Sequence, residues 1–377
     1  MSAGPVRVLD ALRRAGDRPC SGEALSHEYG ISRAQVWKDV ETLRARGYRI
    51  EAAAGDGYRL AAAPDRLYPE EIQHGLTTRW LARAIHYFDE TDSTNRVALD
   101  LARDGAPHGT AVIAESQTAG RGRLGRRFHS PPYLNLYTSI VLRPELDLRD
   151  APAWILASAV AVADTVADAL GDGDASFAQR GKPSGAQRGE AERRSDGPGE
   201  RRPAASFAQR AEGERRPADL VEIKWPNDVL IDGRKTCGIL MELAAEATRV
   251  AFLVLGIGVN LNVDPASFPD EFRAHATSLA AWRSGPVDRA AFARALYTRL
   301  EGVLDACAAT GFRGILPRFE ARFRMRGRRV RVRELDGQPQ EGRVHGIDDD
   351  GALQLEVASG AVVRFLAGDV TLAEEPA

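Results

Sequence analysis

Apolar residues at the start of the chain recur with the period of a helix, and glycine or polar residues interrupt them at short intervals. The pattern predicts helices over 6–15, between Ser21 and Gly30, and over 33–46, followed by two short strands within 48–60. Ser32 is placed to cap the third helix, and Gly55-Asp56-Gly57 is a hairpin signal. Three helices followed by a hairpin is the plan of a winged helix-turn-helix, which we assign to residues 1–63. The alternative is a small helical packing or protein-interaction domain, which the order of the elements and the hairpin disfavour.

Strands alternate with helices over residues 68–320. The strands follow one another too closely for a simple series of parallel βαβ units, so the pattern predicts an α/β domain with a mixed sheet. The expected strands are one ending near 88 and those over 110–114, 135–142, 220–224, 229–231, 238–243 and 250–256; the expected helices are 95–103, 154–170 and 288–308.

One segment inside this domain, residues 171–217, breaks the pattern. It contains no Val, Ile, Leu, Met, Tyr or Trp, and the sequence Ala-Ser-Phe-Ala-Gln-Arg occurs in it twice, at 175–180 and 205–210. Such a segment buries too little apolar surface to offset the entropy of ordering, so we expect a duplicated, disordered insertion. An arginine-rich tether for nucleic acid is the alternative, which the interleaved Asp and Glu residues disfavour.

Short runs of alternating apolar and polar residues fill the tail, 324–377. The runs over 330–332, 342–347, 353–357 and 362–366 are separated by turn signals such as Asp336-Gly337 and Asp350-Gly351. This pattern predicts a small all-β barrel of SH3-like size.

Composition and charge narrow the function classes. Hydrophobic residues make up 44% of the 377 residues, which is enough for two or three buried cores. The formal net charge is only -2, so any anion site must be local. The 3 cysteines show no metal-ligand or disulfide spacing, and no apolar run reaches the length of a membrane span. We therefore expect a cytoplasmic protein with no membrane segment and no metal site.

The run Gly120-Arg121-Gly122-Arg123-Leu124-Gly125-Arg126 is the first candidate for chemistry. Glycine lets a backbone approach a ligand closely, and arginine binds phosphate or acyl-phosphate oxygens through paired hydrogen bonds. The run and the adjacent Arg127 contain no acidic residue. The pattern indicates a local anion site, although a solvated loop or an RNA-binding segment has the same composition.

The second candidate is Lys224-Trp225-Pro226-Asn227-Asp228. A lysine at the end of an apolar strand either snorkels to solvent or points into a cleft. In a cleft, Lys224 would neutralise a carboxylate and an α-phosphate as they meet, and Asp228 would orient a cation or an incoming amine. A plain turn is the alternative.

Two further stretches place small or polar residues beside predicted strands. Ser93, Thr94 and Asn95 form a hydroxyl and amide cluster that suits a small polar head group, or that simply caps a helix. Gly256-Ile257-Gly258-Val259-Asn260 ends an apolar strand and suits the close approach of a nucleotide, or a tight bend.

Taken in order, these motifs closely resemble the biotin–protein ligases. The resemblance covers nearly the whole chain except 171–217, and the N-terminal winged helix matches the bifunctional form, the biotin operon repressor type. It rests on the following stretches: 92–95, 114–123, 135–137, 224–228, 238–242 and 256–260. The family often has an arginine where this chain has Leu124.

The resemblance implies a class II synthetase-like catalytic domain that condenses biotin and ATP, with Mg2+, to biotinyl-5'-AMP. The acyl group then passes to a lysine of a biotin carrier domain. Lys224 and Arg123 would be catalytic. The implied biotin or biotinyl-AMP contacts are Ser93, Thr94, Asn95, Gln117, Gly120, Arg121, Gly122, Arg123, Lys224 and Gly238; the implied ATP contacts are Arg126, Asn227 and Asn260.

Partners follow from the same resemblance. The carrier would be a subunit of a biotin-dependent carboxylase, and the adenylate-bound form would be a homodimer that binds operator DNA. The helix after Ser32 would present Ser32, Arg33, Gln35 and Lys38 to the DNA. Two other functions stay open at this point: a ligand-sensing transcription factor without ligase activity, and a lipoate or octanoyl transferase.

Overall fold

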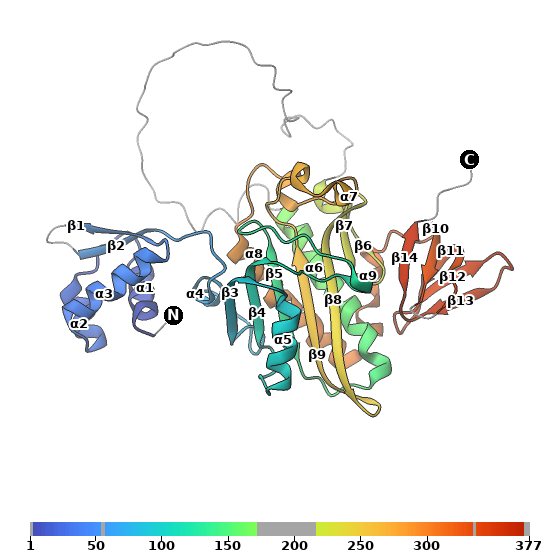
Figure 1. Ribbon diagram of the computed structural model, residues 1–377, viewed down its shortest axis with the longest axis horizontal. Helices are drawn as coiled ribbons and strands as arrows, with labels where there is room; N and C mark the ends of the chain where they lie inside the picture. Colours follow the sequence, from blue (N-terminus) through green and yellow to red (C-terminus); the bar gives the residue numbers. More distant parts are fainter. Residues whose placement is uncertain (1–2, 54–56, 172–215, 335–336, 373–377) are drawn as a thin grey trace, which may run out of the picture. The chain divides into compact units, whose positions relative to one another are not determined.

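The computed structural model describes residues 3–53, 57–171, 216–334 and 337–372 (Figure 1). They divide into two compact units, one ending at Arg66 and one beginning at Leu67. Apart from its two ends, the insertion predicted over 171–217 lies outside the described residues.

The first unit is the predicted winged helix-turn-helix. Helices α1 (Ala3–Ala15), α2 (Gly22–Tyr29) and α3 (Arg33–Ala45) precede the antiparallel strands β1 (Arg49–Ala53) and β2 (Gly57–Ala62). Apolar residues at helical spacing form its core: Val8, Leu9, Leu12, Leu25, Val36, Val40 and Leu43. The Ser32 hydroxyl accepts a hydrogen bond of 3.1 Å from the N–H of Gln35, which confirms the predicted cap. Of the predicted hairpin signal Gly55-Asp56-Gly57, the first two residues lie outside the described residues, and Gly57 begins β2.

A seven-stranded mixed sheet organises the second unit, as predicted. Its order is β3-β4-β5-β9-β8-β7-β6, with β3 parallel to β4 and all other neighbours antiparallel. The strands are β3 (Ile85–Thr91), β4 (Ala111–Gln117), β5 (Leu136–Leu142), β6 (Val221–Lys224), β7 (Asp228–Ile231), β8 (Arg234–Glu246) and β9 (Arg249–Val259).

Both faces of this sheet are apolar and each is covered by helices. On β5, Ile140 and Leu142 join the large core, whereas Val141 between them packs in a second cluster under α5 (Thr94–Arg103). The large core lies against α6 (Ala151–Gly171) and α8 (Arg289–Thr310), which pack on each other (Figure 1). Burial on both faces explains why the strands are near-continuous apolar runs.

Three short helices were not predicted: α4 (Pro69–Gln73), α7 (Asp270–Arg273) and α9 (Leu316–Arg322). Each is too short to show a helical period in the sequence.

Among the described residues, one helical stretch, Leu148–Gly171, is long and apolar enough to cross a membrane, and 89% of its most apolar part is buried. That burial is typical of a core helix.

The tail forms an antiparallel sheet of order β13-β12-β11-β10-β14. Its strands are β10 (Arg329–Arg333), β11 (Gln340–Ile347), β12 (Leu353–Val357), β13 (Val362–Phe365) and β14 (Asp369–Leu372). The all-β prediction is confirmed, while closure of the sheet into a barrel stays a prediction. Trp225, only 1% exposed, donates from Nε1 to the carbonyl of Gly351 at 3.0 Å and so fastens this sheet to the central domain.

Candidate active site

A cavity of about 560 Å³ lies where the Arg-Gly loop, the ends of β6 to β9 and the C-terminal sheet meet. Nearly all of the site residues predicted from the sequence line it: Ser93, Thr94, Asn95, Gln117, Arg121, Gly122, Arg123, Arg126, Lys224, Asn227, Gly238 and Asn260. Gly120 is not among the lining residues. A Cβ on Gly120 would lie 2.7 Å from the carbonyl oxygen of Phe128, so glycine is required there by packing.

The first wall of the cavity is polar and is built at the start of α5. The N–H of Thr94 donates to Gln117 Oε1 at 2.9 Å, and the Thr94 hydroxyl donates to the same oxygen at 3.1 Å. The Ser139 hydroxyl donates to Asn95 Oδ1 at 2.6 Å, and Asn95 Nδ2 donates to Glu242 Oε2 at 2.8 Å. Three strands and one helix therefore fix these side chains before any ligand arrives.

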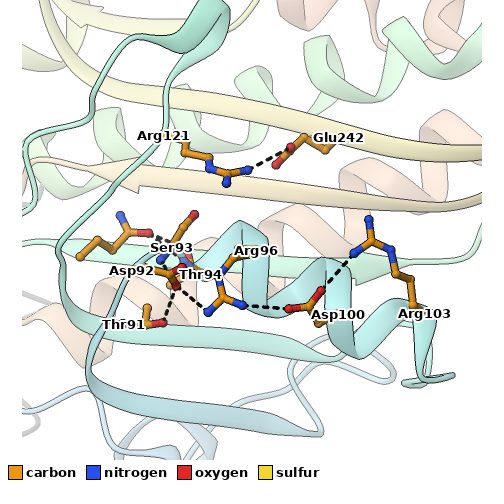
Figure 2. A network of polar contacts seen from close by, with 10 residues as sticks. Thr91, Asp92, Ser93, Thr94, Arg96, Asp100, Arg103, Arg121 and Glu242 are labelled. Carbon is orange, nitrogen blue, oxygen red and sulfur yellow. Dashed lines mark hydrogen bonds and ion pairs between the residues drawn. The ribbon is translucent and has the colours of Figure 1, made fainter.

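Asp92 holds the turn from β3 into α5 (Figure 2). Its carboxylate accepts hydrogen bonds from Arg96 at 2.7 Å and from the N–H of Ser93 at 2.7 Å. The hydrogen bond from Arg96 is the main reason why the pKa of Asp92 falls to about 2. Asp92 is therefore ionised at any physiological pH and keeps Ser93 at the mouth of the wall.

The floor of the cavity consists of glycines under an aromatic ring. A Cβ on Gly258 would meet the Phe128 ring at 2.7 Å, and one on Gly238 would meet it at 3.4 Å. A Cβ on Gly256 would lie 1.9 Å from Asn95 Oδ1. Gly256 and Gly258 must be glycine for Asn95 and Phe128 to lie against the sheet, which gives the glycines of β9 a physical role. At Gly238 the distance to the ring is that of an ordinary van der Waals contact.

The Arg-Gly loop is a small hairpin standing on this floor. The N–H of Gly122 donates to the Arg126 carbonyl at 2.7 Å, and the N–H of Phe128 donates to the Gly120 carbonyl at 2.9 Å. Leu124, at the tip, has the left-handed backbone of φ 54° and is half exposed. The side chain of Leu124 is thus not required inside the cavity, although the family often has an arginine here.

The tip of the loop reaches two other parts of the chain. Arg123 donates from Nη1 to Asn227 Oδ1 at 2.9 Å and from Nη2 to the Gly368 carbonyl at 2.5 Å. Arg126 forms a two-pronged ion pair with Asp369, at 3.3 Å and 2.5 Å. Burial lowers the pKa of the Arg123 guanidinium below its usual value. The two sequence motifs therefore meet directly, through Arg123 and Asn227.

Cationic groups without a fixed partner face the same cavity. Across the described chain, the side chain of Lys224 makes no hydrogen bond or ion pair, and Arg121 has only a distant ion pair of 3.9 Å with Glu242 (Figure 2). Asp228 is paired with Lys235 at 2.7 Å. Lys224 and Arg121 are consequently available to an anionic ligand, whereas Asp228 is already neutralised.

Asn260 directly follows β9 and lines the cavity. Its Nδ2 donates to the Thr277 carbonyl at 3.2 Å, while the buried Oδ1 has no hydrogen-bond partner in the part of the chain that the structure describes. His129 and Phe268, whose rings are 5.9 Å apart, line the cavity too. An unsatisfied buried acceptor costs free energy that a donor from a ligand would remove.

Several lining residues escaped the sequence analysis. Phe128 directly follows the arginine run, and the nearby glycines were the only signal that a ring would cover them. Glu242 lay within a motif used for the resemblance, but nothing in the sequence linked it to Asn95. Asp369 and Arg328 belong to the C-terminal sheet, and the sequence carried no sign that this sheet borders the site.

In the first unit, the residues predicted to contact DNA lie at the start of α3. Ser32, Arg33, Gln35 and Lys38 are all exposed, as is Trp37 at 54%. The Ser32 hydroxyl is used as the helix cap, and Gln35 Nε2 donates to Asp39 at 2.9 Å. Arg33 and Lys38 have no ion pair with any described residue, so their charges face solvent.

No group of three or more His, Cys, Asp or Glu side chains suited to a metal occurs among the described residues. A magnesium ion that arrives on ATP does not require such a cluster, because Mg2+ is commonly held by substrate phosphates and one or two carboxylates. Glu222 is a carboxylate of the cavity wall that has no ion pair with any described residue, whereas Asp228 of the same wall is paired with Lys235. The residues present therefore fit Mg2+ as part of the nucleotide substrate.

Comparison with known proteins agrees with this geometry. Residues 87–260 match the biotin/lipoate A/B protein ligase family, residues 7–59 match an HTH domain, and residues 327–372 match the biotin protein ligase C-terminal domain. The biotin protein ligase of Aquifex aeolicus in complex with biotin and ATP has the same fold, with a TM-score of 0.55, 23% identity and coverage of 78% of this chain and 100% of that one.

Curated relatives are similar along nearly the whole chain. The bifunctional ligase/repressor BirA of Bacillus subtilis is 34% identical over 97% of each chain, and that of Escherichia coli is 28% identical over 98% of this chain and 97% of its own. The biotin–[acetyl-CoA-carboxylase] ligase of Mycobacterium tuberculosis is 31% identical over 81% of this chain and 97% of its own. This chain therefore belongs to the family of bifunctional biotin ligase/repressor proteins.

Proposed function

We propose that this protein activates biotin with MgATP to biotinyl-5'-AMP and diphosphate, and then transfers the biotinyl group to a lysine of a carrier domain. The observation that carries the proposal is the 2.9 Å hydrogen bond from Arg123 to Asn227. It unites the Arg-Gly loop with the Lys224–Asp228 motif around one cavity large enough for a small acid and a nucleotide.

In the first step, the biotin carboxylate attacks the α-phosphorus and diphosphate leaves. Two anions must approach each other, and the unpaired amine of Lys224 at the cavity wall would offset their repulsion. Arg121 would add a second positive charge once a ligand draws it from Glu242, 3.9 Å away. We assign catalysis to Lys224 and Arg123.

The polar wall suits the ring of biotin, which carries two N–H donors and one carbonyl acceptor. Ser93, Thr94, Asn95 and Gln117 supply both kinds of partner in fixed positions. The apolar part of the ligand would then lie along the glycine floor beside Phe128. Recognition by buried, prearranged polar groups rejects ligands that lack the matching atoms.

The adenine side would lie toward Asn260, where the unsatisfied Oδ1 suits an amino group. Both polar atoms of the Asn227 amide have partners within the protein. Its Oδ1 accepts a hydrogen bond from Arg123, and its Nδ2 donates one to the Ile239 carbonyl at 2.7 Å. We therefore propose that Asn227 and Arg126 act on the ATP side of the site by shaping the Arg-Gly loop.

The product of the first step is a mixed anhydride that water hydrolyses. A closed loop protects such an intermediate until the acceptor arrives. In the second step, the ε-amine of the carrier lysine attacks the acyl carbon and AMP leaves. The carrier would be a domain of a biotin-dependent carboxylase in the cytoplasm.

The N-terminal domain adds a regulatory function to this proposal. Arg33, Gln35 and Lys38, at the start of α3, would contact operator DNA. The adenylate-bound protein would act as a homodimer, since paired half-sites require two such helices.

One experiment tests the proposed function. The full-length protein is incubated with MgATP and either biotin or lipoate, and the acyl-AMP and the acylated carrier domain are measured. We expect biotinyl-AMP and a biotinylated carrier. Preference for lipoate would indicate the related transferase, and biotin binding without adenylate would indicate a ligand-sensing transcription factor.

A further inference from the structure

The tip of the Arg-Gly loop is held by the C-terminal sheet rather than by the central domain alone. Asp369, the first residue of β14, accepts two hydrogen bonds from Arg126, and the neighbouring carbonyl of Gly368 accepts one from Arg123. The Asp369 side chain is 19% exposed and that of Arg126 is 63% exposed, so only the carboxylate side of this ion pair is shielded from water. The two parallel hydrogen bonds give the contact a defined geometry, and an exposed ion pair of this kind contributes about 1 kcal/mol.

The base and the tip of the loop are thus fixed by different domains. At the base, Phe128 rests on Gly238 and Gly258 of the central sheet. At the tip, contacts from residues 368–369 outnumber the single contact from Asn227. A glycine-rich loop has high conformational entropy, so its closed form depends on these few contacts.

We propose that Asp369 is a positioning residue that latches the Arg-Gly loop over the acyl-adenylate. The inference rests on the proposed function and deepens it, because it makes the C-terminal sheet a part of the device that retains the intermediate. Arg126 is then a latch residue whose two Nη groups are engaged by Asp369. Two other cations of the cavity wall, Lys224 and Arg328, have side chains with no partner within the described chain. They would bind the phosphates, because Arg126 is engaged by Asp369.

The test compares Asp369→Ala and Asp369→Asn with a matched control, Glu341→Ala. Glu341 forms an arginine ion pair of 2.5 Å with Arg331 in the same sheet, but it does not line the cavity. Three quantities are measured in the full-length protein: the rate at which preformed biotinyl-AMP leaves, the rate of trypsin cleavage within residues 121–127, and the melting temperature.

We expect both Asp369 variants to release biotinyl-AMP about fivefold faster than wild type, the factor set by the loss of an ion pair of about 1 kcal/mol. Trypsin should cut the loop faster in both variants, while Glu341→Ala should match wild type in both assays. Asp369→Glu should restore most of the retention. If Asp369 served only to stabilise the C-terminal sheet, Glu341→Ala and Asp369→Ala would lower the melting temperature to a similar extent. The two variants would then release biotinyl-AMP at the same rate.

Two results would overturn the inference. One is wild-type release and wild-type cleavage in both Asp369 variants. The other is faster adenylate formation with unchanged release. That result would mean that the Arg126–Asp369 ion pair belongs to the ligand-free protein and breaks when the ligands bind. If the wild-type protein made no biotinyl-AMP at all, the proposed function would fail, and the cleavage assay on the ligand-free protein would still decide whether Asp369 holds the loop.

Discussion

Replacing Gly256 by alanine is expected to displace Asn95 from the polar wall and so to impair biotin binding. The added Cβ would lie 1.9 Å from Asn95 Oδ1 and 2.8 Å from its Cγ, distances that no side chain tolerates. Gly256 lies within β9, between neighbours that pair with β5 and β8, so the backbone has little freedom to retreat. The Asn95 side chain must therefore rotate away.

The cost follows from the hydrogen bonds that Asn95 makes. Its bond to the Glu242 carboxylate (2.8 Å) has a charged acceptor, and its bond from the Ser139 hydroxyl (2.6 Å) is neutral and buried. Losing both lowers the free energy of unfolding by about 2 to 4 kcal/mol. Because Asn95 is one of the residues proposed to contact biotin, displacing its amide should raise the Kd for biotin by at least about tenfold, the effect of one lost hydrogen bond.

The prediction is checked by denaturant unfolding and by calorimetric titration with biotin. Gly302→Ala is the matched control, because Gly302 is exposed on α8 and a Cβ there meets nothing within 4 Å. That control should bind biotin like wild type and gain about 0.5 to 1 kcal/mol of stability. Wild-type stability and wild-type biotin affinity in Gly256→Ala would refute the reasoning that a fixed Asn95 builds the site.

Three further outcomes are expected. Arg123→Gly should lose biotinyl-AMP into solution, because it removes both contacts of Arg123 at the loop tip; adenylate retained as tightly as in wild type would contradict the loop assignment. Lys224→Ala should lower adenylate formation by about 100- to 1,000-fold in a pyrophosphate-release assay, and near-normal rates would remove its assigned role. Deleting 172–217 should leave carrier biotinylation within about twofold, because a Cβ on Gly171 would lie 3.9 Å from that of Ala218 and the cut ends already meet; a large loss of transfer rate would show that the insertion acts in catalysis.

Much of the fold could be predicted because its signals are local. The capping hydroxyl of Ser32, the apolar run of α6 and the alternation along β10 each lie within one element. The buried ion pair between Glu115 and Arg289, both fully inaccessible, could not be predicted. The two residues are 174 positions apart in the chain, so no local pattern indicates that they pair.

Most residues that line the cavity could be predicted because their types imply a chemistry, whereas the residues that hold them in place could not. Arginine beside glycine indicates an anion, and Asn95 beside two hydroxyl residues indicates a polar pocket. Nothing in the sequence indicated that Glu242 would hold Asn95. The strand predicted over 238–243 contains Glu242, but its extension to Arg234–Glu246 was not predicted either. The extension arises from pairing with β9, which stabilises polar residues in a strand that their own pattern does not favour.

The largest change to the sequence-based hypothesis concerns the C-terminal sheet. The resemblance to the ligase family assigned Arg126 to ATP, and the alternating pattern of the tail predicted a separate small domain. In the structure, Asp369 lies 243 residues after Arg126 and pairs with it, while Trp225 anchors the same sheet through Gly351. Because the C-terminal sheet contacts the central domain through Trp225 and the Arg-Gly loop through Asp369, a shift of this sheet would also shift the loop. Retention of the adenylate should therefore depend on how firmly this sheet is docked, and not only on the arginines that face the ligand.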